Sequence, residues 1–465
     1  MQNRDKKRIL ILGGGFAGVE CTLKLESYFK NNSNIEIILV SEDNFLLFTP
    51  MLPQVASGTI ETRHIVTPIR TLIKKTKFYE AKIKNIDPHG NIVTLFGTTE
   101  NRGMRIHYDF LIVALGSQTN FFGLKDVEER SYKMATINDA ILLRNRIIDL
   151  LEQAENETDP IMRKRFLQIV VVGGGFAGVE TAGEINDFIN EAAEYYPSIS
   201  YKDVKVKLIE ANSEILSGFP QKLAEFAKEK LVERGIEVIL NASVTSFDGQ
   251  EINLKSQSES NKVLVENSEQ EKGHYKLKEL NSIQSNTLIW TAGTRPIDLV
   301  KESLFETAKG RILVNKFLQV PKFPNVFAIG DCAIFDPSLS MKKYPPTAQI
   351  AEAHAKFAAN NLRLMLSGNQ MISFDYTWKG QSALIGKRTG VASFFGLNIA
   401  GFFAFILWRN LYLSKIRGWE KKLRVWLDWN LDLFFKRDIS RLKVFKKEKP
   451  VDFRELDEVD DVWEL

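Results

Sequence analysis

The sequence predicts an α/β protein with two Rossmann-like domains and a helical C-terminal region. The first observation is an internal repeat: residues 8–20 read RILILGGGFAGVE, and residues 168–180 read QIVVVGGGFAGVE. In both copies an apolar run typical of a buried strand leads into a glycine-rich turn and then a helix-forming stretch. The second observation is a change after residue 376, where tryptophans and basic residues become frequent.

The composition excludes several classes of protein. The 465 residues are 44% hydrophobic and 26% charged, a balance typical of folded soluble domains. The net charge of +4 is too small to predict nucleic-acid binding. Two cysteines exclude a disulfide scaffold and a four-cysteine cluster, and no metal is expected. The first apolar run breaks at Gly13, so it lacks the length of a signal peptide and we expect a cytoplasmic chain.

The glycine spacing has a specific physical meaning. In each copy the first glycine allows a tight turn, the second lets a pyrophosphate approach the backbone, and the third lets the helix pack on the strand. The phosphate then lies at the N-terminus of that helix. The predicted dinucleotide-binding residues are Gly13, Gly14, Gly15, Phe16, Ala17 and Gly18 in the first copy, and Gly173, Gly175 and Gly178 in the second.

Each copy is followed by a strand that ends close to an acidic residue, Glu42 after the first and Glu210 after the second. A carboxylate at this position accepts hydrogen bonds from the ribose hydroxyls of an adenine dinucleotide and repels a 2′-phosphate. We therefore expect Glu42 to bind the adenosine half of FAD, and Glu210 to favour NADH over NADPH.

Three further strand-like segments, 108–117, 286–294 and 324–333, end in small residues and glycine. Such turns bring the backbone close to a cofactor, and an acid at the last of them can bind the ribityl chain of a flavin. The predicted contacts are Ala114, Gly116, Gly330 and Asp331 for FAD, and Gly293 for NADH.

The order of these segments predicts the domain organisation. The FAD-binding domain comprises 1–120 and 308–375, and the NADH-binding domain, 121–307, is inserted into it. Residues 376–465 form a C-terminal membrane-association region. The polar stretch 255–286 is expected to be an exposed hairpin or loop without chemistry.

The C-terminal region combines apolar and basic character. The apolar run 399–408 is about half of the roughly 20 residues that span a bilayer. Residues 409–449 contain 13 basic and 5 acidic residues, a net charge of +8. One helical face carries Trp419, Leu423, Trp426, Leu427, Leu431, Phe434 and Phe435. This pattern predicts an amphipathic helix in the membrane interface; the alternative is a helix packed on its own domain or on a dimer partner.

With these motifs, the sequence resembles the type II NADH:quinone oxidoreductases, single-chain flavoproteins of respiratory membranes. The resemblance covers nearly the whole chain and is carried by residues 44–58, 162–185 and 379–386 and the apolar run that ends at Trp408. It implies non-covalent FAD, NADH as substrate and a membrane quinone as acceptor. Hydride passes from NADH to N5 of FAD, and two electrons then reduce the quinone without proton pumping. It also implies peripheral attachment to the cytoplasmic face of the cell membrane. Whether the protein forms a homodimer is left open.

The resemblance also assigns catalytic roles to Glu180, Lys379 and Gln349, and places Thr49 and Ala348 at the flavin. Glu180 either contacts the nicotinamide end or forms part of a proton route; the alternative is a buried acid paired with Lys379 for structure alone. The family's quinone motif, A-Q-x-A-x-Q, reads AQIAEA here, so Ala353 replaces its second glutamine.

His354 follows this altered motif, and it is either a substitute quinone contact or a surface histidine.

Two other functions stay open. A sulfide:quinone oxidoreductase-like enzyme needs a redox cysteine pair near the flavin, and Cys21 and Cys332 are not spaced as such a pair. A redox-sensing flavoprotein that binds NADH without quinone turnover is supported by the altered quinone motif alone.

Overall fold

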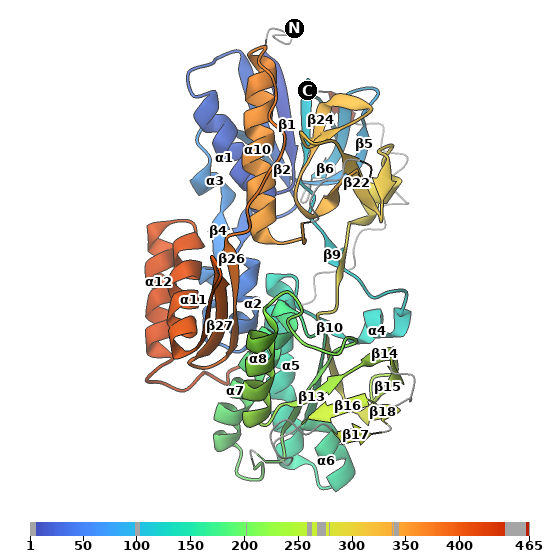
Figure 1. Cartoon of the computed structure of the whole chain (residues 1–465), viewed down its shortest axis with the longest axis vertical. Helices are drawn as coiled ribbons and strands as arrows, with labels where there is room; N and C mark the ends of the chain where they lie inside the picture. Colours follow the sequence, from blue (N-terminus) through green and yellow to red (C-terminus); the bar gives the residue numbers. More distant parts are fainter. Residues whose placement is uncertain are drawn as a thin grey trace.

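The computed structural model describes residues 6–97, 103–200, 202–257, 263–266, 276–278, 280–336, 338, 344–441 and 462–464. The chain forms a first domain, an inserted domain at the opposite end of the molecule, and a C-terminal domain packed beside them (Figure 1). This arrangement agrees with the predicted fold class.

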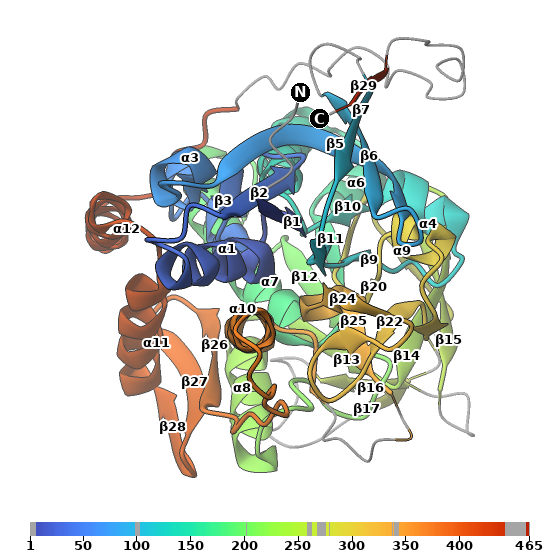
Figure 2. The same cartoon turned by 90° about the horizontal axis from the view of Figure 1, so that it is seen from above.

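The first domain is built around a twisted sheet whose described strands run in the order β23-β24-β8-β1-β2-β5-β6-β7-β29. The strands at the centre of its parallel part are largely buried, as expected for strands rich in Ile, Leu and Val. The strands are β1 (Lys7–Leu12), β2 (Ile35–Ser41), β5 (Lys77–Asp87), β6 (Ile92–Gly97), β7 (Gly103–His107), β8 (Phe110–Val113), β23 (Gln319–Val320), β24 (Phe323–Ala328) and β29 (Val462–Glu464). Helices α1 (Phe16–Tyr28) and α10 (Ala348–Leu366) lie side by side in this domain (Figure 2).

Smaller elements lie along the same stretches of the chain, and one of them, α2, packs on helices of the inserted domain. They are β3 (Phe45–Leu47), η1 (Thr49–Met51), α2 (Leu52–Ala56), η2 (Thr62–His64), β4 (Val66–Pro68), α3 (Ile69–Leu72), α9 (Asp298–Glu302), β21 (Thr307–Ala308), β22 (Arg311–Val314), η4 (Gly330–Cys332) and β25 (Ala333–Phe335).

The inserted domain repeats the same plan, with strand order β10-β19-β11-β12-β13-β16-β17 among the described strands. Strands β16 and β17 pair antiparallel, so part of the polar stretch forms the hairpin expected there. The elements are β10 (Tyr132–Lys133), β11 (Gln168–Val172), β12 (Lys205–Ile209), β13 (Glu237–Leu240), β14 (Ala242–Phe247), β15 (Glu251–Ser256), β16 (Val263–Glu266), β17 (Lys276–Lys278), β18 (Ser282–Gln284), β19 (Thr287–Trp290), α4 (Lys125–Arg130), α5 (Ile137–Asn156), α6 (Pro160–Phe166), α7 (Phe176–Ala192), η3 (Ala193–Tyr195) and α8 (Gln221–Glu233).

The chain crosses between these two domains twice, and the crossings pair with each other. Strand β9 (Gln118–Thr119) runs antiparallel to β20 (Thr294–Arg295). Shortly after the second crossing, Val300 and Phe305 are already packed into the core of the first domain. The chain therefore re-enters the first domain before residue 307, the predicted end of the inserted domain.

The C-terminal domain is a three-strand antiparallel unit followed by two helices, counted over the described residues. It comprises β26 (Gly380–Gly386), β27 (Thr389–Phe394), β28 (Leu397–Gly401), α11 (Phe402–Lys415) and α12 (Trp419–Leu431). The two helices lie on the outer side of the strands (Figure 2). Of the helices in the part of the chain described, none is long and apolar enough to cross a membrane.

One buried cluster joins the C-terminal helices to the inserted domain. Trp408, Val425 and Trp429 belong to the same cluster as Val171 of β11 and Ile185 of α7. One face of the C-terminal helices therefore packs on the protein itself, as the alternative interpretation expected, and the predicted apolar stripe faces outward.

Candidate active site

The first glycine-rich turn has the geometry that a pyrophosphate requires. Gly13 adopts φ +111°, and a Cβ there would lie 2.2 Å from the carbonyl oxygen of Ala114. A Cβ on Gly18 would lie 1.8 Å from the carbonyl oxygen of Gly13, so the helix packs directly on the turn. A Cβ on Gly15 would meet no atom within 4 Å. Phe16 then begins α1, so this open position lies at a helix N-terminus suited to an anion.

The second turn has the same geometry. Gly173 adopts φ +109°, and a Cβ on Gly178 would lie 1.7 Å from the carbonyl oxygen of Gly173. A Cβ on Gly175 again meets open space, immediately before α7. Both turns therefore fit the pyrophosphate of a dinucleotide, one in each domain.

The carboxylate of Glu210 is held at the second turn. Its Oε2 accepts a hydrogen bond from the backbone N–H of Gly174 at 2.5 Å, and its Oε1 accepts one from the backbone N–H of Asn212 at 2.9 Å. These two bonds fix the side chain at the end of β12, where a ribose hydroxyl would be recognised.

The strand register places Ser41, rather than Glu42, at the equivalent position in the first domain. Gly13 N–H donates to the carbonyl of Val40, just as Gly173 N–H donates to that of Ile209. The residue that follows is Ser41 in one domain and Glu210 in the other. Glu42 lies one residue further, and its exposed side chain pairs with Lys82 at 3.0 Å. The prediction of Glu42 took the acidic residue nearest to the end of the strand, because the sequence alone does not give the register between β1 and β2.

The other predicted contacts of the first domain lie at strand ends beside the turn. Gly116 and Gly330 adopt φ values of +67° and +73°, which favour glycine. The carboxylate of Asp331 accepts a hydrogen bond from Ser117 Oγ at 2.9 Å, and burial raises its pKa.

Two predicted contacts lie in loops. Gly293 adopts φ +79° in the second interdomain crossing, and a Cβ there would lie 3.0 Å from the ring of Phe122. Thr49 is exposed at the start of η1. The adjacent Phe48 is buried and packs edge-on against Phe16 of the first glycine-rich turn. This contact holds the Thr49 loop close to that turn.

Helix α10 begins at the predicted quinone motif. The hydroxyl of Thr347 caps the helix by accepting a hydrogen bond from Ile350 N–H. Ala348 and Gln349 form the first turn, and both are half-buried. The side-chain nitrogen of Gln349 donates to the hydroxyl of Tyr376 at 2.6 Å. Tyr376 was absent from the residues predicted for the site.

His354 is not the surface histidine that one of the two interpretations expected. It is 4% exposed, and its Nδ1 accepts a hydrogen bond from Gly330 N–H at 3.2 Å. Burial lowers the pKa of His354 to about 3, so the ring is neutral. Ala353 is buried in the core of the first domain.

Glu180 and Lys379 do not form the pair that one interpretation required. Glu180 is 6% exposed, and its Oε1 accepts a hydrogen bond from Leu384 N–H at 3.0 Å. Burial raises the pKa of Glu180 to about 8, although Leu384 and Trp408 partly offset this effect. Lys379 is exposed, just before β26.

The approach of α7 to β26 depends on a glycine. A Cβ on Gly183 would lie 2.5 Å from the carbonyl oxygen of Ile385. Any larger residue would force helix and strand apart, and the bond from Leu384 to Glu180 would be lost.

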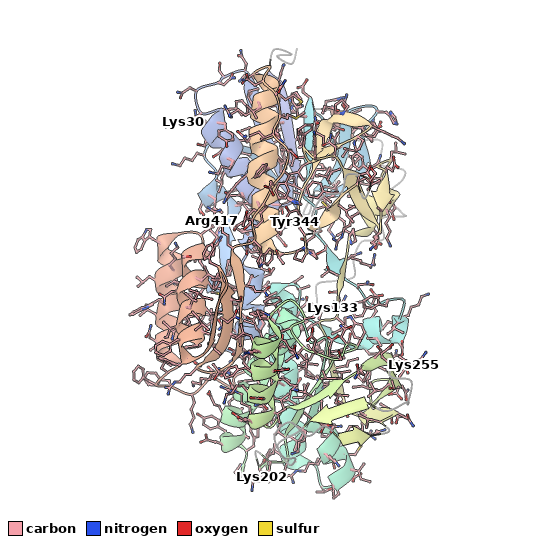
Figure 3. The ribbon with its side chains drawn as sticks, in the orientation of Figure 1. Lys30, Lys133, Lys202, Lys255, Tyr344 and Arg417 are labelled. Atoms are coloured by element: carbon pink, nitrogen blue, oxygen red, sulfur yellow. The ribbon has the colours of Figure 1, made fainter. Side chains whose placement is uncertain are left out.

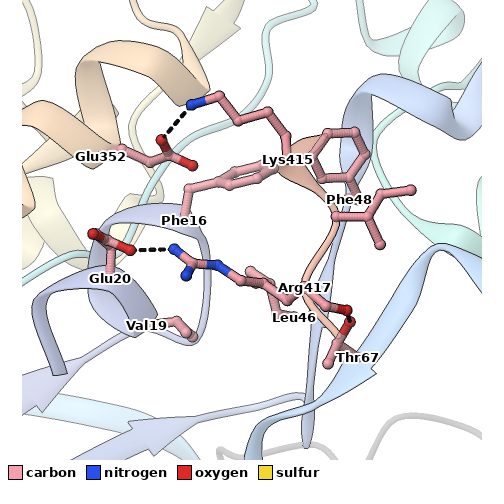
Figure 4. A pocket seen from close by; sticks show the side chains of 10 residues that line it. Phe16, Val19, Glu20, Leu46, Phe48, Thr67, Glu352, Lys415 and Arg417 are labelled. Carbon is pink, nitrogen blue, oxygen red and sulfur yellow. Dashed lines mark hydrogen bonds and ion pairs between the residues drawn. The ribbon is translucent and has the colours of Figure 1, made fainter. Parts of the chain in front are cut away.

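A narrow cavity lies where the C-terminal domain meets the first domain (Figure 4). Phe16 and Phe48 form apolar walls, and the segment after α11 closes it. Lys415 pairs with Glu352 of α10 at 3.1 Å, and Arg417 pairs with Glu20 of α1. Figure 3 shows Arg417 at this junction. Lys415 and Arg417 belong to the basic stretch whose net charge predicted a membrane interface, and both pair with carboxylates of the first domain.

Other basic residues of the same stretch also form contacts within the protein. Arg437 is 6% exposed and pairs with Glu184 at 3.3 Å, so it is unavailable to lipid. Arg409 lies over the rings of Phe405 and Trp429. Lys443, Lys446, Lys447 and Lys449 lie outside the described residues.

The two cysteines do not form a redox pair. Both are free and fully buried, Cys21 in α1 and Cys332 in η4. Burial raises the pKa of the Cys332 thiol to about 11 and that of Cys21 further. Since the thiolate is the reactive form, neither residue supports sulfide or disulfide chemistry.

Comparison with known proteins agrees with this geometry. A family model described as pyridine nucleotide-disulphide oxidoreductase matches residues 7–355, and one described as NDH2 C-terminal domain matches residues 378–438. The structure of NDH2 from Plasmodium falciparum in complex with NADH superposes with a TM-score of 0.82 at 24% identity, covering 94% of this chain and 100% of that one. A sulfide:quinone oxidoreductase from Aquifex aeolicus superposes with a TM-score of 0.67 at 18% identity, covering 92% and 96%. The fold and site thus define an oxidoreductase of the pyridine nucleotide-disulphide class.

Sequence relatives narrow the class. A probable NADH dehydrogenase of Dictyostelium discoideum is 34% identical over 447 residues, which cover 94% of this chain and 91% of the relative. The type II NADH:quinone oxidoreductase Ndh of Mycobacterium tuberculosis is 30% identical over 440 residues, covering 92% and 88%. The chain belongs to the type II NADH:quinone oxidoreductase family.

Proposed function

We propose that the protein oxidises NADH and reduces a membrane quinone, with FAD as its resident cofactor and without proton pumping. The observation that carries the proposal is the pair of open glycine positions, Gly15 and Gly175, each at the N-terminus of a helix in its own domain. A bound flavin supplies the chemistry, accepting a hydride from NADH and passing two electrons to the quinone.

In the inserted domain, Gly173, Gly175 and Gly178 hold the pyrophosphate of NADH, and Glu210 binds its adenosine ribose. The backbone bonds from Gly174 and Asn212 hold the Glu210 carboxylate in place before the nucleotide arrives. This preorganisation reduces the entropy lost on binding.

In the first domain, the turn from Gly13 to Gly18 holds the FAD pyrophosphate. Asp331, oriented by Ser117, accepts hydrogen bonds from the ribityl chain. Ser41, at the position equivalent to Glu210, faces the adenosine ribose in place of Glu42. The Thr49 loop, fixed by Phe48, lies against the flavin ring.

Protons reach the quinone through side chains near the interdomain junction. Because burial raises the pKa of Glu180 to about 8, this carboxyl is protonated at neutral pH and can hold a proton for transfer. Gln349, in the first turn of α10, hydrogen-bonds the quinone.

The quinone enters from a membrane on which the C-terminal helices lie peripherally, at the cytoplasmic face. Large apolar side chains are exposed together on α11, α12 and the segments beside them, and such a patch typically marks an interaction surface. They are Phe395, Leu397, Phe402, Phe403, Ile406, Trp419, Leu423, Trp426, Leu427, Leu431, Phe434 and Phe435.

The test is steady-state NADH oxidation by the full-length protein in detergent, with a soluble quinone analogue or with ferricyanide. We expect turnover with both acceptors, and expect the supernatant of the denatured protein to contain FAD. Turnover with ferricyanide alone would favour a redox sensor, and sulfide-dependent quinone reduction would favour the sulfide-oxidising alternative. FMN in place of FAD would refute the cofactor assignment.

A further inference from the structure

We propose that Tyr376 is a positioning residue that orients the amide of Gln349 for quinone reduction. The inference rests on the proposed role of Gln349. Its basis is the 2.6 Å hydrogen bond from Gln349 Nε2 to the Tyr376 hydroxyl, which joins the first turn of α10 to the segment that leads into the C-terminal domain.

This bond determines what the amide presents to a ligand. A glutamine amide carries one acceptor and two donors. With one N–H bound to Tyr376, rotation of the amide is restricted, and its carbonyl oxygen is directed away from the phenol. The Gln349 side chain has three flexible torsions, so fixing it in advance removes an ordering cost from the bound state.

Tyr376 can do this because it is itself held firmly. Its backbone N–H donates to the hydroxyl of Tyr344 at 3.3 Å, and that hydroxyl donates to the carbonyl of Tyr376 at 3.4 Å. Figure 3 shows Tyr344 at the edge of the first domain that faces the rest of the molecule. The ring of Tyr376 lies at 11° to that of Phe374, with 6.4 Å between centroids.

Phe374 connects this support to the predicted flavin contacts. It is 2% exposed, and its ring lies edge-on to His354, 4.7 Å between centroids. His354 in turn accepts the N–H of Gly330. Tyr376 is therefore anchored to the turn that precedes Asp331, and Gln349 is held at a fixed position relative to that turn.

The experiment compares the two half-reactions of the full-length protein by stopped flow. In Tyr376→Phe, the ring and its packing remain and only the hydroxyl is lost. A neutral hydrogen bond of this kind corresponds to about a three- to tenfold effect. We expect reoxidation of the NADH-reduced enzyme by a soluble quinone to slow by this factor, while reduction by NADH stays within about twofold of wild type.

The matched control is Tyr195→Phe, which removes a phenol hydroxyl from an exposed ring of η3 in the inserted domain. It should leave both half-reactions at the wild-type rate. A double-mutant cycle supplies the decisive readout: in the Gln349→Ala background, Tyr376→Phe should have no further effect on reoxidation, since it acts through the amide.

If the wild-type protein reduces quinone, two results would overturn the inference. One is an unchanged reoxidation rate in Tyr376→Phe. The other is that Tyr376→Phe slows reoxidation in the Gln349→Ala background by as much as it does alone. A wild type that oxidises NADH but reduces no quinone would instead refute the proposed function, and the inference with it.

Discussion

Arg437 and Glu184 form a buried ion pair, with 3.3 Å between Nη2 and Oε2. The arginine follows α12 near the end of the described C-terminal segment, and the glutamate lies in α7, the helix that begins at the second glycine-rich turn. The hydroxyls of Ser57 and Thr59 donate to the same carboxylate oxygen. Three segments distant in sequence therefore meet at one carboxylate.

Arg437→Ala should destabilise the protein strongly. Removing one partner of a buried ion pair leaves the other charge uncompensated, which typically costs about 3–5 kcal/mol. Lys436→Ala is the control, because Lys436 is exposed and its pairing with Glu194 lies at the surface. Thermal denaturation should show a clear fall in Tm for Arg437→Ala alone. Adding Glu184→Gln to Arg437→Ala should recover part of the lost stability. Equal Tm values for Arg437→Ala and Lys436→Ala would contradict a stabilising role of the buried ion pair.

Glu180→Gln should change how stability depends on pH. The pKa of Glu180 is raised from its ordinary value of 4.5 to about 8 in the folded protein, so between these values the unfolded chain has lost a proton that the folded protein keeps. Stability contributed by this group therefore falls as pH rises from 4.5 to 8. Glutamine cannot ionise. The Tm difference, variant minus wild type, should thus be larger at pH 8.5 than at pH 5, and a pH-independent difference would contradict the raised pKa.

Glu210→Gln should weaken the choice of NADH over NADPH. Hydrogen bonds to charged groups are worth about 1.5–3 kcal/mol, so wild type should favour NADH by roughly tenfold to a hundredfold in kcat/KM. The variant loses the charge that repels a 2′-phosphate, and its ratio should approach unity. Glu229→Gln, an exposed site on α8, is the matched control and should keep the wild-type ratio. Equal kcat/KM for both nucleotides in wild type would refute the role of Glu210.

Replacing the exposed side chains of α12 should release the protein from membranes while preserving its fold. Leu423, Trp426 and Leu427 are 46%, 48% and 44% exposed, so a triple serine variant removes outward-facing surface. Each large apolar side chain contributes about 1.5–3 kcal/mol when buried. Affinity for anionic liposomes should therefore fall at least a hundredfold in a flotation assay.

The control for this experiment replaces two exposed apolar residues elsewhere, Ile161 and Leu304, with serine. That variant should float like wild type. If wild type itself does not bind anionic liposomes at any ionic strength, the membrane-docking proposal fails and the flavin chemistry is unaffected.

The sequence was sufficient to predict the geometry of the two glycine-rich turns, because their glycines are required by local backbone geometry. Gly13 and Gly173 need positive φ, and Gly18 and Gly178 need helix contact, and all of these are short-range constraints. The residue of the first domain that corresponds to Glu210 could not be predicted in the same way. It depends on the register between β1 and β2, which pairs Leu12 with Val40, and a shift by one residue separates Ser41 from Glu42.

The supporting residues of the site were missed for a different reason. Tyr376 bonds Gln349 across 27 residues, and Arg437 reaches Glu184 across 253, so no local pattern reveals either contact. Arg437 belongs to a basic stretch whose composition suggested lipid contact, and burial distinguishes it from its neighbours. Gly183 did offer a signal, as a glycine inside a helical pattern often marks a close packing contact.

The shared core has a consequence for how the protein is made. Trp408, Val425 and Trp429, which lie late in the chain, complete a hydrophobic cluster begun by residues of α5 and α7, and Trp429 donates a hydrogen bond to Gln54 of α2. During synthesis, the inserted domain therefore leaves the ribosome long before the segment that covers it. A nascent chain stopped before residue 429 exposes this apolar surface, so ribosome-bound or truncated forms should need chaperones and should aggregate without them.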